Sequence, residues 1–197
     1  MTTYFTADQH WGHANIIKFC NRPFASVEEM DREMIERWNA VVDHDDTVYH
    51  LGDWTMGDFA QFGHVFRQLK GTVYTILGSH DNRWWQGLSI TPENKSGNRL
   101  QVMIPNTTLA SIIIQHPSLH NARGYLPIVL CHYAMRSWDR SHYGSWHLFG
   151  HHHGTLPPHG YSFDVGVDSW EFYPVSLDQV ARKMSTLKPL LVGDKDA

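Results

Sequence analysis

The chain has 197 residues and a formal net charge of −4 at neutral pH. Hydrophobic residues make up 42% and charged residues 18%, a balance that fits a packed globular protein and excludes an intrinsically disordered one. The charge excludes the basic footprint of a protein that binds long nucleic acid. The length predicts a single domain spanning residues 1–197.

The chain is rich in histidine and poor in cysteine. The 15 histidines nearly equal the 16 lysines and arginines taken together. The two cysteines, Cys20 and Cys131, lack the spacing of a metal-binding pair and indicate reduced thiols. Apolar stretches such as 109–114 and 126–131 are too short to span a membrane, and no signal peptide follows Met1. We therefore expect a cytoplasmic protein without a membrane partner.

Short apolar runs that end at polar clusters predict buried strands. These runs cover residues 4–7, 47–51, 73–77, 128–131 and 146–149. After the first run, Ser26 and Glu29 have capping-box spacing, and the apolar residues that follow predict a helix over about 27–43. A second helical pattern extends from Phe59 to Leu69. The alternation of strands and helices predicts an α/β protein with a mainly parallel sheet.

The middle and the end of the chain have different patterns. Segments 100–104 and 109–115 flank Pro105-Asn106 and predict a β-hairpin. Residues 162–167 predict a further strand. A last helix is expected to begin near Ser176, because Ser176 and Gln179 have capping-box spacing and an apolar helical face follows.

Carboxylates and histidines follow the five predicted strands in order. They are Asp8-Gln-His10, Gly52-Asp53, Gly78-Ser79-His80-Asp81, His132 and Gly150-His151-His152-His153. In open α/β sheets, functional groups gather beyond the carboxyl ends of the strands. A single aspartate or histidine of this kind is more often a helix cap or a satisfied core residue. The ordered set instead predicts a metal centre, because its oxygen and nitrogen donors suit divalent ions.

This set resembles the pattern of the calcineurin-like metallophosphoesterases, which reads D-x-H, G-D, G-N-H-[DE], H and G-H-x-H. The resemblance extends from Asp8 to His153 and is greatest to the small phosphoesterases of bacteria and phages. It implies a four-layer α-β-β-α sandwich, an α/β fold with two central mixed sheets and the metal site at the carboxyl ends of the strands. It also implies hydrolysis of small phosphodiesters or phosphomonoesters, including nucleotides, by a hydroxide that bridges two metal ions.

The resemblance gives each matching residue an expected role. Asp8, His10 and His153 would bind one metal, His132 and His151 would bind the other, and Asp53 would bridge the two. His80 would protonate the leaving group, and Asp81 would orient His80. The two divalent ions would be manganese, with iron, zinc, nickel and cobalt as alternatives.

Ser79 stands where the family pattern has asparagine, as a candidate ligand of the second metal. A neutral serine hydroxyl is a weaker ligand than an amide oxygen, so the second metal is the more vulnerable one. Three alternatives follow: a natural variant that recruits a water molecule, an engineered substitution that weakens activity, or a site that no longer turns over. In the last case the protein would be a metallophosphoesterase-like scaffold that binds metal or partners without catalysis.

Arg136 and His13 are the candidate substrate-binding residues. Arg136 lies close to His132 in sequence and could hold a phosphate through two hydrogen bonds, although surface salt bridges are the commoner use of arginine. His13 follows the first motif closely. Asp164 and Asp168 are expected to make hydrogen bonds around the site and not to bind metal.

Overall fold

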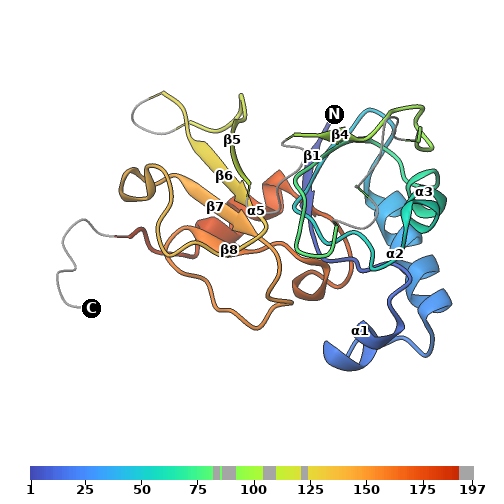
Figure 1. Ribbon diagram of the computed structural model, residues 1–197. Coiled ribbons are helices and arrows are strands. Elements are labelled where there is room, and N and C mark those ends of the chain that lie inside the picture. Colours follow the sequence, from blue (N-terminus) through green and yellow to red (C-terminus); the bar gives the residue numbers. More distant parts are fainter. Residues whose placement is uncertain (82–84, 86–91, 104–109, 121–123, 191–197) are drawn as a thin grey trace.

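Two mixed β-sheets lie at the centre of the fold, with helices flanking them (Figure 1). In this computed structural model, the described residues are 1–81, 85, 92–103, 110–120 and 124–190. The predicted α/β class with two mixed sheets is confirmed, and the five predicted strands are present with slightly shifted ends.

The first sheet has five strands in the order β4-β3-β2-β1-β9. Their bounds are Thr3–Thr6 for β1, Thr47–His50 for β2, Thr72–Thr75 for β3, Gln101–Val102 for β4 and Val175–Ser176 for β9. Neighbours from β1 to β4 are parallel, whereas β9 runs antiparallel to β1. The carboxyl ends of β1, β2 and β3 therefore meet at one edge of the sheet.

The second sheet has four strands in the order β5-β6-β7-β8. Their bounds are Ser111–Gln115 for β5, Pro127–Cys131 for β6, Trp146–Phe149 for β7 and Ser162–Asp164 for β8. β5 runs antiparallel to β6, and the other neighbours are parallel. An isolated parallel bridge between Ala7 and Gly166 joins the segment after β8 to the end of β1. This bridge brings the carboxyl ends of the two sheets together.

Helix α2 spans Val27–Val41 and α5 spans Leu177–Met184, and both begin where the sequence predicts. Ser26 Oγ accepts the backbone N–H of Glu29 at 3.2 Å, and Ser176 forms a full capping box with Gln179. Within the described ranges, the structure also has α1, Ala14–Phe19, which the sequence did not predict, and α3, Phe59–Phe66. It has two 3-10 helices there as well, η1, Ser141–Tyr143, and η2, Val167–Ser169. Among the described helices, none combines the length and the apolar character that crossing a membrane requires.

An outer core packs α2 and α3 against the first sheet. Met34 and Trp38 of α2 and Phe66 of α3 are buried there with Val48 of β2 and Val73 of β3. The alternation of strand side chains directs Val48 and Val73 to this face. Both helices thus lie on the side of the first sheet that faces away from the second sheet (Figure 1).

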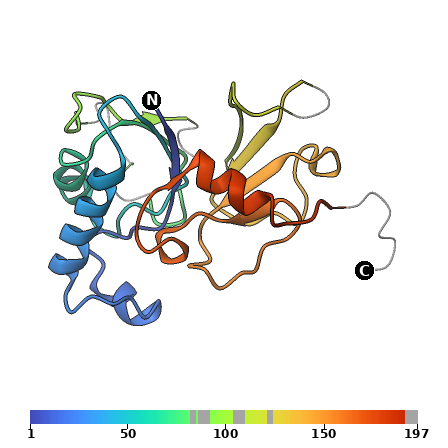
Figure 2. The same ribbon diagram turned by 180° about the vertical axis from the view of Figure 1, so that it is seen from behind.

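An inner core fills the space between the two sheets. Phe5 of β1 meets Leu130 and Leu148 of the second sheet, and all three are fully buried. Val180 and Met184 of α5 belong to the same cluster, and Figure 2 shows α5 in front of the second sheet. The inner core fixes the two sheets relative to each other. The carboxyl ends of their strands can converge because of this fixed arrangement.

The predicted hairpin of segments 100–104 and 109–115 is wrong. β4 pairs in parallel with β3 in the first sheet, whereas β5 pairs with β6 in the second. The reason is burial: Leu100 and Val102 pack in the outer core, and Ile112 and Ile114 pack against the inner one. The turn expected at Pro105-Asn106 lies outside the described residues.

Candidate metal centre

The side chains that follow β1, β2, β6 and β7 form two groups of metal-ligand atoms. Donor atoms of Asp8, His10 and His153 lie within 4.8 Å of one another. Donor atoms of Asp53, His132 and His151 form the second group by the same measure. The structure thus brings together the residues that the sequence resemblance assigned to each metal and to the bridge.

Asp53 lies between the two groups. Its Oδ2 atom is 3.7 Å from His10 Nε2 of the first group and 3.3 Å from His132 Nε2 of its own group. The side chains of Asp53, His10 and His132 are almost completely buried. One carboxylate oxygen therefore faces both groups.

Several buried polar atoms of these groups lack hydrogen-bond partners within the described part of the chain. They are Asp8 Oδ1, both ring nitrogens of His10, and His132 Nε2. A buried polar atom without a partner costs free energy, and clusters of them are rare in folded proteins. The donor types and their convergence fit divalent cations, which would satisfy these atoms.

Hydrogen bonds fix the ring orientation of one histidine in each group. His132 Nδ1 donates to the carbonyl of Leu51 at 2.8 Å, and His153 Nδ1 donates to Asp168 Oδ2 at 2.7 Å. In each ring the Nε2 atom is then left as the acceptor, which is the form that binds a metal. The predicted outer hydrogen-bonding role of Asp168 is confirmed by this contact.

The electrostatics of the site follow from burial and from Asp53. Burial raises the pKa of Asp8 to about 8 and lowers the pKa of His10 to about 3. Burial opposes the charged form of His132 as well, but the nearby Asp53 carboxylate outweighs it and raises the His132 pKa to about 9. The same contact overcomes the burial of Asp53 and holds its pKa below the usual range. A cation would compete with the His132 proton for the Asp53 charge.

Five ligand candidates have backbone angles in the left-handed region. The φ angles are 63° for Asp8, 54° for His10, 59° for Asp53, 70° for His151 and 49° for His153. Such angles are uncommon for residues other than glycine and cost free energy that the surrounding structure must supply. This strain is concentrated at the ends of strands, where the ligand side chains converge.

The glycines of the motifs are explained by close backbone approach. A Cβ atom on Gly52 would lie 2.3 Å from the Gly78 nitrogen, and one on Gly78 would lie 2.2 Å from Asp53 Oδ1. A Cβ atom on Gly150 or on Gly166 would lie 2.6 Å from Asp8 Oδ2. Glycine at these positions lets the loops that carry Asp8 and Asp53 pack against their neighbours without a side chain between them.

Ser79 and His80 contact Asp53 from the side of solvent. Ser79 Oγ donates to Asp53 Oδ2 at 3.0 Å, and the backbone N–H of His80 donates to Asp53 Oδ1 at 2.8 Å. The His80 side chain is 44% exposed, and its Nε2 atom lies 3.9 Å from Asp53 Oδ2. Its ring centroid is 5.4 Å from that of His10. His80 therefore lies at the entrance to the two groups.

Asp81 is fully buried and holds two ligand loops together. Its carboxylate accepts backbone N–H groups from Asp53 at 2.8 Å, Gly78 at 2.7 Å and Trp54 at 2.9 Å. These bonds fix the start of the Gly52-Asp53 turn against the Gly78–Asp81 turn. The role of Asp81 in orienting His80 stays a prediction.

The two predicted substrate-binding residues lie in different places. His13 holds the N-cap position of α1 without a side-chain capping bond, and its ring centroid lies 5.7 Å from that of His10 in the first ligand group. Arg136 is exposed and lines a pocket of about 420 Å³ together with Met135 and Phe149. Their contacts with a substrate stay predictions.

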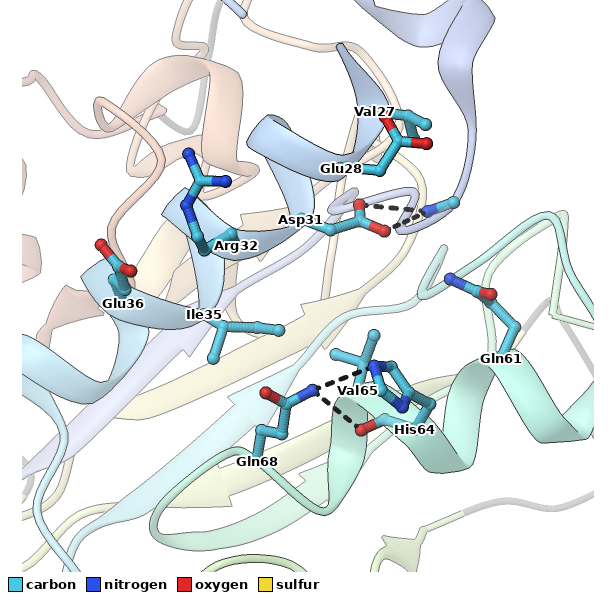
Figure 3. A pocket seen from close by; sticks show the side chains of 11 residues that line it. Val27, Glu28, Asp31, Arg32, Ile35, Glu36, Gln61, His64, Val65 and Gln68 are labelled. Carbon is cyan, nitrogen blue, oxygen red and sulfur yellow. Dashed lines mark hydrogen bonds between the residues drawn. The ribbon is translucent and has the colours of Figure 1, made fainter.

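Asp31 supports the loop that carries Asp8 and His10, and the sequence analysis did not predict this role. Both of its carboxylate oxygens accept the backbone N–H of Gly12, at 3.0 and 3.1 Å. Asp31 lies in a pocket of about 550 Å³ between α2 and α3, and Figure 3 shows its carboxylate pointing across this pocket. Burial raises the pKa of Asp31 to about 6. Its place on a helix between Met30 and Arg32 gives no local signal of this contact.

Arg22 is the second residue that sequence reasoning missed. Its guanidinium donates to both carboxylate oxygens of Asp168, each at 2.8 Å. A further set of donor atoms, from Cys20, His153 and Asp168, lies within 4.8 Å. Asp168 is already occupied by Arg22 and His153, and burial raises the pKa of the Cys20 thiol to about 11, which keeps it protonated. This set therefore supports His153 and makes a poor metal site.

The fold and the site define an α/β protein of two mixed sheets with a buried cluster of histidine and aspartate side chains suited to metal ions. No protein-family model matches the chain. The chain is 31% identical over 188 residues to the uncharacterized protein MJ1445 of Methanocaldococcus jannaschii, with 91% of this chain and 89% of that protein covered. It belongs to the same family as that archaeal protein.

Two further relatives extend this comparison. The Gene 66 protein of Mycobacterium phage L5 is 27% identical over 188 residues, which cover 85% of this chain and 87% of the phage protein. The crystal structure of AQ665, a protein of unknown function from Aquifex aeolicus, matches with a TM-score of 0.64 at 19% identity. That match covers 92% of this chain and 98% of AQ665, so the two proteins share the whole fold.

Proposed function

We propose that the protein is a dinuclear metal-dependent hydrolase of small phosphodiesters and phosphomonoesters, nucleotides included. The observation that carries this proposal is the place of Asp53 Oδ2, 3.7 Å from His10 Nε2 and 3.3 Å from His132 Nε2. A carboxylate there suits a bridge between two cations. Manganese is the first candidate, with iron, zinc, nickel and cobalt as alternatives, since oxygen and nitrogen donors accept all of these ions.

The side chains divide the work of this proposed reaction. Bound divalent ions would neutralise charge on the phosphoryl oxygens and acidify a water molecule. His80 Nε2, at the entrance to the site, would hold a proton and donate it to the departing oxygen. His13 and Arg136 would contact the phosphate ester from the rim. Asp81 would keep the loops of Asp53 and His80 in register.

The contact of Ser79 supports a working site. Its hydroxyl donates to Asp53 Oδ2 at 3.0 Å, so it restrains the proposed bridging carboxylate. Without this bond, Asp53 Oδ2 would contact, among the described side chains, only the neighbouring histidine rings. Among the three alternatives for Ser79, we favour the natural variant that recruits a water molecule and leaves the site active.

The direct test measures hydrolysis of bis(p-nitrophenyl) phosphate and metal content together, for the wild type and for Ser79→Asn. We expect hydrolysis that depends on manganese, is removed by a chelator and returns with added metal. Ser79→Asn should bind the second metal more tightly, because an amide oxygen is a better ligand than a hydroxyl. Two folded, metal-loaded proteins without any hydrolysis would refute the catalytic proposal and favour a metal-binding scaffold.

His80→Ala is expected to slow hydrolysis in proportion to how poor the leaving group is. Loss of a positioned acid typically costs about 10² to 10⁴-fold. We expect a loss in this range for alkyl phosphate esters and less than about tenfold for p-nitrophenyl esters, whose leaving group needs no proton. The measurement is kcat over a series of leaving groups with manganese saturating.

His142→Ala serves as the matched control, because His142 is an exposed histidine of η1. It should leave all rates unchanged. An equal loss for alkyl and p-nitrophenyl esters in His80→Ala would contradict the assigned role, as would loss of bound metal in that variant.

A further inference from the structure

Arg22 is a buried cation that reaches three parts of the candidate metal centre. Its side chain has no exposed surface. Nη1 donates to the carbonyl of Gln9 at 2.7 Å, and Nη2 donates to the carbonyl of Asp8 at 2.7 Å. Nε and Nη2 also bind the two carboxylate oxygens of Asp168. A buried guanidinium with this many short contacts is highly constrained and constrains its partners in turn.

Each contact leads to one member of the first ligand group. The Asp8 carbonyl fixes the backbone of Asp8 itself, and the Gln9 carbonyl belongs to the peptide unit that carries the nitrogen of His10. Asp8 and His10 both have left-handed φ angles, which a directed hydrogen bond to the intervening peptides helps to hold. Asp168 Oδ2, held by Arg22, accepts Nδ1–H of His153 at 2.7 Å. One guanidinium thus connects Asp8, His10 and His153.

The second ligand group is held by other atoms. His132 donates to the Leu51 carbonyl, and the Asp53 backbone donates to Asp81. Among the contacts of the described residues, the hydrogen bonds of Arg22 go to Asp8, Gln9, Asp168 and the sulfur of Met30. The hydrogen bonds of Arg22 therefore reach the first group alone. The two groups are joined by other contacts, from the His10 N–H to the Asp53 carbonyl at 3.2 Å and from the His151 N–H to Asp8 Oδ2 at 2.7 Å.

We propose that Arg22 is a positioning residue that orders the Asp8–His10–His153 group and leaves the Asp53–His132–His151 group to its own supports. The inference rests on the proposed metal centre and is independent of hydrolysis. The planar fork of arginine is needed, because two parallel bonds to Asp168 and two carbonyl contacts must be made at once. Lysine would keep the charge and lose this geometry.

The test is a calorimetric titration with manganese, which measures the affinity of each binding event. It is made on the metal-free wild type, Arg22→Lys and Arg22→Met. In both variants, one of the two binding events should weaken about 10 to 100-fold, as expected for loss of an outer hydrogen-bond partner. The other event should stay within about threefold of the wild type. Ethylguanidinium added to Arg22→Ala should restore part of the lost affinity.

Arg37→Met is the matched control. The Arg37 guanidinium lies 5.6 Å from the Phe172 ring, and that of Arg22 lies 5.7 Å from the same ring. Arg37 donates to the carbonyl of Glu171 and pairs with the Glu33 carboxylate at 3.5 Å, and neither partner belongs to a ligand loop. Arg37→Met should therefore leave both binding events unchanged, although it removes a guanidinium that lies beside the same ring.

A second readout needs no metal. Nitrogen NMR of the His153 ring should find the Nδ1–H tautomer in the wild type and a mixture of tautomers in Asp168→Asn and Arg22→Met. Folded Arg22 variants that weaken both metals equally or neither, or that keep the wild-type tautomer, would overturn the inference. A wild type that binds two manganese ions and hydrolyses no phosphate ester would refute the proposed function alone.

Discussion

Asp53→Asn is expected to abolish metal-dependent hydrolysis and to lower the bound metal from about two equivalents to fewer than one. Asp53 Oδ2 faces both ligand groups, so removal of its charge weakens both at once. Loss of a hydrogen-bonding partner outside the ligands already costs about 10 to 100-fold in affinity or activity. Loss of a shared carboxylate should cost more. Metal analysis after dialysis against a fixed free manganese concentration, with parallel rate measurements, gives both quantities.

The control for this experiment is Asp45→Asn, which removes an equal charge from an exposed loop residue. It should retain the metal and the rate of the wild type. Circular dichroism and the unfolding midpoint of both variants separate a folding defect from a binding defect. Retention of two full equivalents by Asp53→Asn would remove Asp53 from the bridging position.

Gly52→Ala is expected to destabilise the fold strongly. The new Cβ would lie 2.3 Å from the Gly78 nitrogen and 2.5 Å from its Cα, so two backbone segments would have to separate. The φ angle of Gly52 is +99°, which adds the cost of a left-handed conformation for alanine. Together we expect a loss of about 3 to 4 kcal/mol in the free energy of unfolding.

Gly97→Ala measures the conformational part of that loss, so its difference from Gly52→Ala gives the steric part. Gly97 has a φ angle of +75° and open space where its Cβ would lie. It should therefore show the conformational cost alone, about 1 to 2 kcal/mol. Urea unfolding of both variants without metal measures the difference. Equal losses for the two variants would show that the Gly52 and Gly78 loops can separate freely, contrary to the structure.

The strands and the major helices could be predicted because their signals are local. The apolar runs before Asp8 and Asp53 and the serine caps of α2 and α5 lie within a few residues of the structure that they specify. The hairpin prediction failed because the partners of its two segments are set by tertiary packing and not by local signals. A turn signal between two apolar segments gives no information on which core each segment enters, and Leu100 and Ile112 enter different ones.

The residues of the site also fall into those that the sequence reveals and those that only the structure reveals. The candidate ligands are recognisable because their order and their positions after strands resemble a known pattern. Arg22 and Asp31 make their contacts through tertiary structure: Arg22 reaches Asp168, 146 residues away, and Asp31 binds a backbone N–H of another segment. The left-handed angles of Asp8 and His10 are likewise invisible in the sequence, because neither residue is a glycine.

The bond from the His151 backbone to Asp8 Oδ2 joins residues 143 positions apart, and this separation has a consequence for synthesis. At about 5 to 20 residues per second, a ribosome needs about 7 to 30 s to travel from the first of these residues to the second. During that interval Asp8 and His10 exist without His153. Synthesis therefore has to pass His153 before the first ligand group is complete, so a metal ion that needs all three of its side chains would bind only late in synthesis.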